Sequence, residues 1–191
     1  MNRSNIQRRA QALITAGAVV LDTETTGLET WDEVIELAAI DMTGRVIFES
    51  LIRPRTAKIH PRAFGVHKIS LERLKDSPQL TELWPLIERE LAGRLVVAYN
   101  APFDRRMLQQ SCRVWADALP EGPQTFDALN LKWSCLMQGY QQWAGGTRAK
   151  LISACVRHGI EPGNHSAASD ARAALGLLQF LAGAREMARA A

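Results

Sequence analysis

Short, mostly apolar segments recur along the first half of this chain, and each ends at a polar residue or a turn. This pattern predicts buried strands at residues 18–22, 34–42, 45–52 and 95–99. Thr43 and Gly44 separate the second segment from the third, which predicts a tight turn and an antiparallel hairpin. A further strand is expected near residues 125–128.

Helices are predicted where apolar residues recur every three or four positions. The clearest case is residues 80–91, where one face carries only apolar side chains, namely Leu80, Leu83, Trp84, Ile87 and Leu91. Residues 149–158 and 167–181 are predicted helices, a short one begins at Ser70, and the first residues form one that ends near Gly17. Asn100 is predicted to cap a helix whose first residue is Pro102.

The order of these elements predicts the fold class. Strands come first and then alternate with helices, which indicates one α/β domain with an antiparallel hairpin on a mostly parallel sheet. The length of 191 residues and the apolar content of 47% suit a single well-covered core. Residues 132–146 contain two tryptophans and a glycine pair and give no clear assignment. We expect Trp133 and Trp143 to pack in or around the core rather than to stack on bases.

Composition excludes several classes of protein. Lys and Arg number 23 and Asp and Glu 20, so the formal charge of +3 neither requires nor excludes a nucleic-acid partner. The cysteines, which are Cys112, Cys135 and Cys155, are odd in number and widely spaced, which excludes a disulfide scaffold and predicts buried thiols. Residues 10–21 follow three arginines but are interrupted by polar side chains, unlike a signal peptide. No membrane span is expected, and we expect a soluble cytoplasmic protein.

Two carboxylates follow the first predicted strand. Asp22 and Glu24 are two residues apart, so both point to the same face, at the end of the strand where open α/β sheets bind ligands. Two neighbouring carboxylates repel unless a cation lies between them, and Mg²⁺ or Mn²⁺ prefers such oxygen ligands. The alternative is a pair of solvated acids in a loop.

Asp104 lies in the first turn of the helix after Asn100. It heads a predicted core-facing stripe of Met107, Leu108, Ser111 and Cys112. An ionisable group at the head of such a stripe lies close to the ends of the central strands. The alternative is an acid that only stabilises the helix dipole, worth a few tenths to about 1 kcal/mol.

His165 and Asp170 are the third candidate element. On one continuous helix, five residues would separate their side chains by about 140°. They converge only if His165 precedes a helix that Ser166 caps. The alternative for His165 is an exposed loop histidine.

Taken together, these segments resemble the DEDDh family of 3′–5′ exonucleases, and most closely its branch of bacterial replicative proofreading exonucleases. The motifs are Asp22-Thr-Glu24-Thr-Thr-Gly-Leu28, Asn100-Ala-Pro-Phe-Asp104 and His165-x₄-Asp170, and residues 63–70 resemble a further segment of that branch. Each motif alone is weak, but all three in order are specific. The resemblance divides the chain into an N-terminal extension (1–17), an exonuclease domain (18–183) and a C-terminal tail (184–191).

The resemblance implies a ribonuclease H-like fold, with helices flanking a five-stranded mixed sheet whose second strand is antiparallel. It implies two Mg²⁺ or Mn²⁺ ions held by Asp22, Glu24, Asp104 and Asp170, with Asp22 bridging. His165 would be the general base toward the attacking water. The expected reaction releases nucleoside 5′-monophosphates from the 3′ end of single-stranded or frayed DNA.

The same resemblance implies substrate contacts, namely Thr25, Leu28, His67 and Asn100, with Leu28 as an apolar wedge against the terminal base. The residues alone leave alternatives open, because Thr25 and Asn100 also suit turn or helix caps, and Leu28 and Phe103 suit the core.

Two positions depart from the family pattern: Lys68 stands where glycine is common, and Tyr99 where histidine is common. Neither is an expected metal ligand. The short C-terminus favours a free-standing exonuclease over a tethered subunit, while a polymerase or repair protein remains a candidate partner. The alternative functions are an exoribonuclease like oligoribonuclease and, from another class, a nucleic-acid-binding module that has lost activity.

Overall fold

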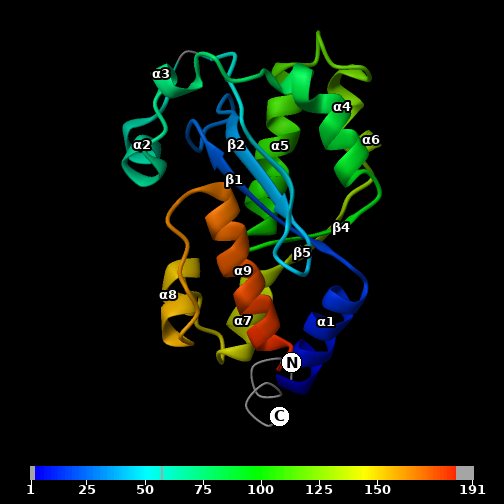
Figure 1. The fold of residues 1–191 in the computed structure, drawn as a ribbon, viewed down its shortest axis with the longest axis vertical. Helices are drawn as coiled ribbons and strands as arrows, with labels where there is room; N and C mark the ends of the chain where they lie inside the picture. Colours follow the sequence, from blue (N-terminus) through cyan, green and yellow to red (C-terminus); the bar gives the residue numbers. More distant parts are fainter. Residues whose placement is uncertain (1–2, 57, 184–191) are drawn as a thin grey trace.

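A computed structural model describes residues 3–56 and 58–183 of the chain. In these residues the strands form one five-stranded sheet with the order β3-β2-β1-β4-β5 (Figure 1). The strands are β1 (Val19–Thr25), β2 (Val34–Ile40), β3 (Val46–Leu51), β4 (Leu95–Ala98) and β5 (Lys132–Cys135). β2 runs antiparallel to β1 and β3, while β4 and β5 continue the sheet parallel to β1. The predicted mixed sheet with an antiparallel second strand is confirmed.

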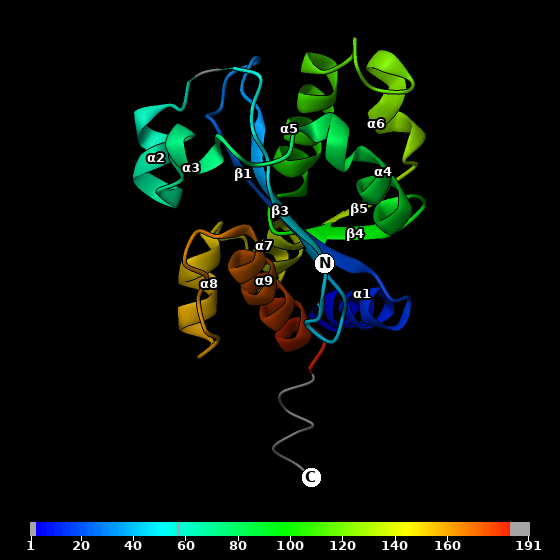
Figure 2. The same ribbon diagram turned by 45° about the horizontal axis from the view of Figure 1, so that its top comes forward.

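Helices cover both faces of the sheet (Figure 2). One face packs against α1 (Arg3–Thr15), α7 (Leu136–Trp143), α8 (Leu151–Arg157) and α9 (Ala167–Leu181). The other packs against α4 (Leu80–Leu91), α5 (Ala101–Val114) and α6 (Thr125–Ala128). Neighbouring residues of β1 alternate between the two cores, because Val20 packs with the first group and Val19 and Leu21 with the second.

Two shorter helices follow β3 and lie beside the C-terminal end of β1 (Figure 1). They are α2 (Pro61–His67) and α3 (Leu71–Leu74). The Ser70 hydroxyl accepts a hydrogen bond from the backbone N of Arg73, 3.2 Å away, so the predicted helix start at Ser70 is confirmed.

The strand predicted near residues 125–128 is wrong. A 3₁₀ turn (Gly122–Gln124) and α6 occupy this region. The buried Thr125 hydroxyl donates to the Gly122 carbonyl at 2.8 Å and accepts from the backbone N of Glu121, which favours a helical turn. The fifth strand is instead β5, inside the segment that had no clear assignment. β5 is an edge strand with an exposed Lys132, so it lacks the continuous apolar run of the central strands.

The N-terminal extension is helical as predicted, and α1 buries Ile6 and Ala10 in the core beside α7 and α9. Trp133 and Trp143 pack at the edges of the two cores, as expected. The predicted tail, 184–191, lies outside the described residues. Among the helices that the structure describes, none combines the length and apolarity needed to cross a bilayer.

Candidate functional site

The acids of the first motif lie where β1 ends, between the two helical layers. Asp22 and Glu24 share one face of β1, and Thr23 between them points to the face covered by α5. The Thr23 hydroxyl donates to Oδ1 of Asp104 at 2.9 Å. Asp104, only 3% exposed, lies in the first turn of α5 above the predicted stripe, all of which is buried. The sheet and α5 therefore bring Asp104 to the motif on β1.

His165 precedes α9, which begins at Ala167, as predicted. Its backbone has a φ of 64°, in the left-handed region, and its N–H donates to Oδ1 of Asp170 at 3.1 Å. Its ring Nδ1 lies 3.9 Å from Oδ2 of the same carboxylate. One ligand atom each from Glu24, His165 and Asp170 lies within 4.8 Å of the others. The strand and the helix start therefore meet in one cluster of ligating atoms.

The pKa values of these acids are raised, chiefly by burial. Burial and the charges of Asp170, Glu36 and Asp104 raise the pKa of Glu24 to about 8. Burial raises the pKa of Asp104 to about 7 and that of Asp170 above its ordinary value. The pKa of Asp22 is raised by burial and then by the neighbouring carboxylates, of which Asp104 has the largest effect.

Within the part of the chain that the structure describes, no lysine or arginine forms an ion pair with the acids of this cluster. The ion pairs that lysine and arginine do form lie elsewhere. Closely spaced carboxylates that repel one another, with a histidine beside them, suit hard divalent cations such as Mg²⁺ and Mn²⁺. The residues present therefore fit a divalent-metal site.

This electrostatic arrangement predicts how stability depends on pH in the absence of divalent ions. A carboxyl with a raised folded-state pKa holds its proton at pH values where the unfolded chain has lost it. Unfolding then releases protons, so the free energy of unfolding falls as the pH rises. The fall begins at about 4, the ordinary pKa of a carboxyl group, and continues through about 7 and about 8, the folded-state pKa values of Asp104 and Glu24.

Urea unfolding in EDTA at pH 5.5 and pH 8 measures this loss of stability. We expect saturating Mg²⁺ to reduce it, because bound cations replace the repulsion between carboxylates. A Glu24→Gln variant, which cannot ionise at this position, should show a smaller loss in EDTA. An equal pH dependence in the wild type with and without Mg²⁺ would contradict the proposed electrostatic origin.

Glu36 is a further carboxylate that the sequence analysis missed. It lies opposite Glu24 in the β1–β2 register and is 6% exposed. Its Oε2 accepts a hydrogen bond from the backbone N of Ala167 at 3.0 Å, whereas Ser166 makes no side-chain capping bond. Glu36 therefore caps α9 beside His165 and Asp170. The signal in the sequence is a single acid within an otherwise apolar strand.

Gly163 is a second residue that sequence reasoning did not identify. A Cβ at this position would collide with the Asp170 carboxylate, so the backbone of the loop before α9 packs directly against it. The loop and Glu36 together hold the start of α9. Nothing in the local sequence distinguishes this glycine from an ordinary loop glycine.

Three of the four predicted substrate residues line one pocket beside the acids. The pocket, of about 340 Å³, is lined by Glu24, Thr25, Leu28, His67 and Phe103 among others. Leu28 is 69% exposed, so the core alternative is wrong for this residue. The Thr25 hydroxyl donates to the Gly27 carbonyl at 2.8 Å and stabilises the turn after β1.

His67 holds the wall of this pocket together. Its Nδ1 accepts from the backbone N of Ile69, so Nε2 carries the proton and donates to the Thr25 carbonyl at 3.2 Å. Burial lowers the pKa of His67. Both ring nitrogens are thus engaged within the protein, and His67 contributes chiefly by fixing Thr25 and α2.

Asn100, the fourth predicted substrate residue, does not line this pocket. It occupies the N-cap position of α5, which begins at Ala101 rather than Pro102, but its side chain makes no capping bond. It lines another, open pocket with Arg148 and Lys150. Tyr99, which stands where the family often has histidine, lines the same pocket. Its hydroxyl donates a hydrogen bond to the Ala149 carbonyl at 2.6 Å, which fixes this side of the pocket.

Lys68, the other departure from the family pattern, ends α2 with a φ of 59°. The left-handed conformation costs an L-residue about 1–2 kcal/mol, and glycine avoids this cost. The backbone therefore explains why glycine suits this position.

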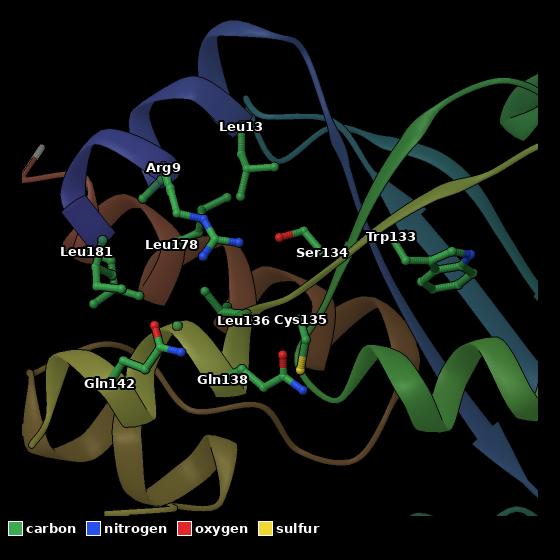
Figure 3. A pocket seen from close by; sticks show the side chains of 13 residues that line it. Arg9, Leu13, Trp133, Ser134, Cys135, Leu136, Gln138, Gln142, Leu178 and Leu181 are labelled. Carbon is green, nitrogen blue, oxygen red and sulfur yellow. The ribbon is translucent and has the colours of Figure 1, made fainter. Parts of the chain in front are cut away.

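A separate pocket of about 180 Å³ lies between α1, β5, α7 and α9 (Figure 3). Its lining combines Arg9, Gln138 and Gln142 with leucines, and no carboxylate contributes to it. It is therefore not part of the acidic site.

Comparisons with known proteins show that this chain is similar to exonucleases. The family model RNase_T, described as exonuclease, matches residues 19–178. The uncharacterized exonuclease CP81 of Escherichia phage 186 is 27% identical, with 95% of this chain and 96% of that protein covered. The DNA polymerase III subunit epsilon of Pasteurella multocida is 29% identical, over 75% of this chain and 58% of that subunit. The structure of exonuclease X with 5′ overhanging duplex DNA superposes with a TM-score of 0.64 at 24% identity, over 88% and 92% of the two chains.

Proposed function

Because the chain belongs to the exonuclease family RNase_T, we propose that it is a divalent-metal-dependent 3′–5′ exonuclease that acts on DNA. The observation that carries the proposal is the cluster of Glu24, His165 and Asp170 ligand atoms within 4.8 Å, beside the half-buried Asp22 and the buried Asp104. The catalytic unit corresponds to residues 18–183. The 3′–5′ polarity rests on the resemblance of the three motifs to DEDDh exonucleases.

Asp22, Glu24, Asp104 and Asp170 would hold two Mg²⁺ or Mn²⁺ ions, with Asp22 shared between them. Two such ions, when bound, supply positive charge to the attacking and leaving oxygens of an in-line displacement. Thr23 and the Gly163 backbone keep Asp104 and Asp170 in place.

His165 is the proposed general base. Its Nδ1 faces the Asp170 carboxylate, so Nε2 is the atom that accepts the proton of the attacking water. Its position before α9, rather than within the helix, leaves the ring 39% exposed and able to reach the substrate. The product is a nucleoside 5′-monophosphate.

The terminal nucleotide would occupy the pocket of Thr25, Leu28 and Phe103, with Leu28 against its base. The preceding phosphates would pass Asn100, Arg148 and Lys150. DNA is favoured over RNA because the relatives include a DNA polymerase subunit and a nuclease bound to duplex DNA. A polymerase or repair protein would then be a natural partner.

The proposal is tested by following labelled single-stranded DNA, duplex DNA with a 3′ mismatch, and short RNA in parallel. We expect stepwise shortening of 5′-labelled DNA in Mg²⁺ or Mn²⁺ and none in EDTA. Faster cleavage of RNA would favour the exoribonuclease alternative. Binding without cleavage in every metal would overturn the enzymatic proposal in favour of a binding module.

Glu36 offers a further test of how the site is positioned. Glu36→Ala removes the cap of α9, and we expect kcat to fall by about 10- to 100-fold, as for residues that orient metal ligands. Glu36→Gln retains an oxygen that can accept from Ala167, so it should recover most of the rate. Equal losses in the two variants would show that the charge of Glu36, rather than its capping bond, matters.

A further inference from the structure

A further pocket lies along α5, beyond the first turn that carries Asp104, and Arg106 links it to Leu28. It has a volume of about 410 Å³, and its walls are Trp31 and the face of α5 that carries Arg106, Gln109 and Arg113. Trp31 is 62% exposed, which is unusual for the largest apolar side chain. No carboxylate lines this pocket. An exposed indole beside two guanidinium groups combines a stacking surface with positive charge.

Arg106 connects this pocket to the proposed nucleotide pocket. Its guanidinium lies 5.5 Å above the ring of Phe103, which lines the nucleotide pocket. Its Nη1 donates to the Leu28 carbonyl at 3.4 Å. Arg106 therefore lines the pocket of Trp31 and contacts two residues of the nucleotide pocket, so the two pockets are neighbours.

The loop that carries Trp31 is held rigidly by its own hydrogen bonds. The Asp32 carboxylate accepts from the Thr26 hydroxyl and the backbone N of Glu29, each at 2.7 Å. Gln110 of α5 donates to the Glu29 carbonyl at 2.8 Å and to the Asp32 carbonyl. This loop is thus fixed to α5 before any ligand binds, so little ordering entropy is lost on binding.

We propose that this pocket binds the strand complementary to the one being cleaved, at the unpaired nucleotides of a 5′ overhang. The inference rests on the proposed function. The cleaved strand ends in the pocket of Leu28 and Phe103, so none of its nucleotides lies beyond Leu28. In a duplex with a 5′ overhang, only the complementary strand continues past that point.

The chemistry of the pocket suits such a single strand. A base of the overhang would stack on Trp31, an interaction that tolerates any sequence because every base has an aromatic face. Arg106 and Arg113 lie beside the same space and neutralise backbone phosphates. The pocket would hold the overhang while Leu28 separates the last base pair.

Trp31→Ala and Arg113→Ala test the proposal on single-stranded DNA and on a duplex with a 5′ overhang. For each variant, we expect the ratio of kcat/KM on the overhang duplex to kcat/KM on single-stranded DNA to fall by about tenfold, the effect of losing about 1.4 kcal/mol of stacking or charge. The loss should lie in KM rather than kcat. Arg89→Ala, which removes an exposed arginine on α4, is the matched control and should leave this ratio unchanged.

Binding to the Asp22→Asn variant in EDTA provides a readout that needs no catalysis. Adding Trp31→Ala to this variant should weaken binding of the overhang duplex more than binding of single-stranded DNA. Equal losses on the two substrates, or no loss on either, would refute the proposal. If wild-type protein cleaves no substrate, the proposed function fails, while the binding comparison still tests the pocket.

Discussion

Replacing Asp22 by Asn is expected to abolish nuclease activity and, at the same time, to stabilise the metal-free protein. The amide keeps the size of the side chain but removes the charge that the proposed bridging ligand needs. Losing several kcal/mol of metal-mediated stabilisation of the transition state corresponds to a rate loss of about 10³-fold or more. The stability should rise because burial and the surrounding acids already disfavour the charged form of Asp22 and raise its pKa.

Single-turnover cleavage and thermal unfolding in EDTA at pH 8 measure the two effects. Asp41→Asn is the matched control, because Asp41 lies in the turn between β2 and β3 and accepts hydrogen bonds from Thr43 and Arg45. These bonds lower the pKa of Asp41, so its charged form is favoured in the folded protein. The control should keep its activity and gain no stability. Retained activity in Asp22→Asn would exclude Asp22 as a metal ligand.

The central part of the fold could be predicted from the sequence because local patterns and tertiary packing agree there. β1, β2 and β4 are central and largely buried, and they therefore contain runs of mostly apolar residues. β5 could not be predicted, because an edge strand with Lys132 and Trp133 lacks such a run. Residues 125–128 have strand-like composition, but the Thr125 hydrogen bonds favour a helical turn.

The candidate site was predictable where the spacing of residues on a strand or helix fixes the direction in which their side chains point. Asp22 and Glu24 share a face by strand alternation, and His165 could meet Asp170 only from outside α9. The contributions of Glu36 and Gly163 depend instead on strand register and on the approach of a loop, which no local spacing reveals. For Asn100 the sequence predicted a contact that the structure does not contain. The residue type predicted a capping hydrogen bond, but the Asn100 side chain makes none.

Replacing His165 by Gly is expected to reduce kcat by about 10²- to 10⁴-fold, the usual contribution of a general base. Glycine is the appropriate substitution because His165 has a φ of 64°, where glycine is unstrained. The backbone N–H that donates to Asp170 is retained in this variant. The substitution therefore removes the imidazole without disturbing the loop before α9 or the Asp170 carboxylate.

Added imidazole distinguishes a chemical role of His165 from a structural one. If the ring accepts a proton from the attacking water, free imidazole should restore part of the rate of His165→Gly, saturating as it fills the vacated space. Asn130→Gly is the matched control, because Asn130 also has a positive φ, of 48°, and lies in the exposed loop before β5. This control should be fully active and insensitive to imidazole. A loss below tenfold in His165→Gly would mean that water is deprotonated without this side chain, and that Asp170 and Glu24 carry the chemistry with the metal ions alone.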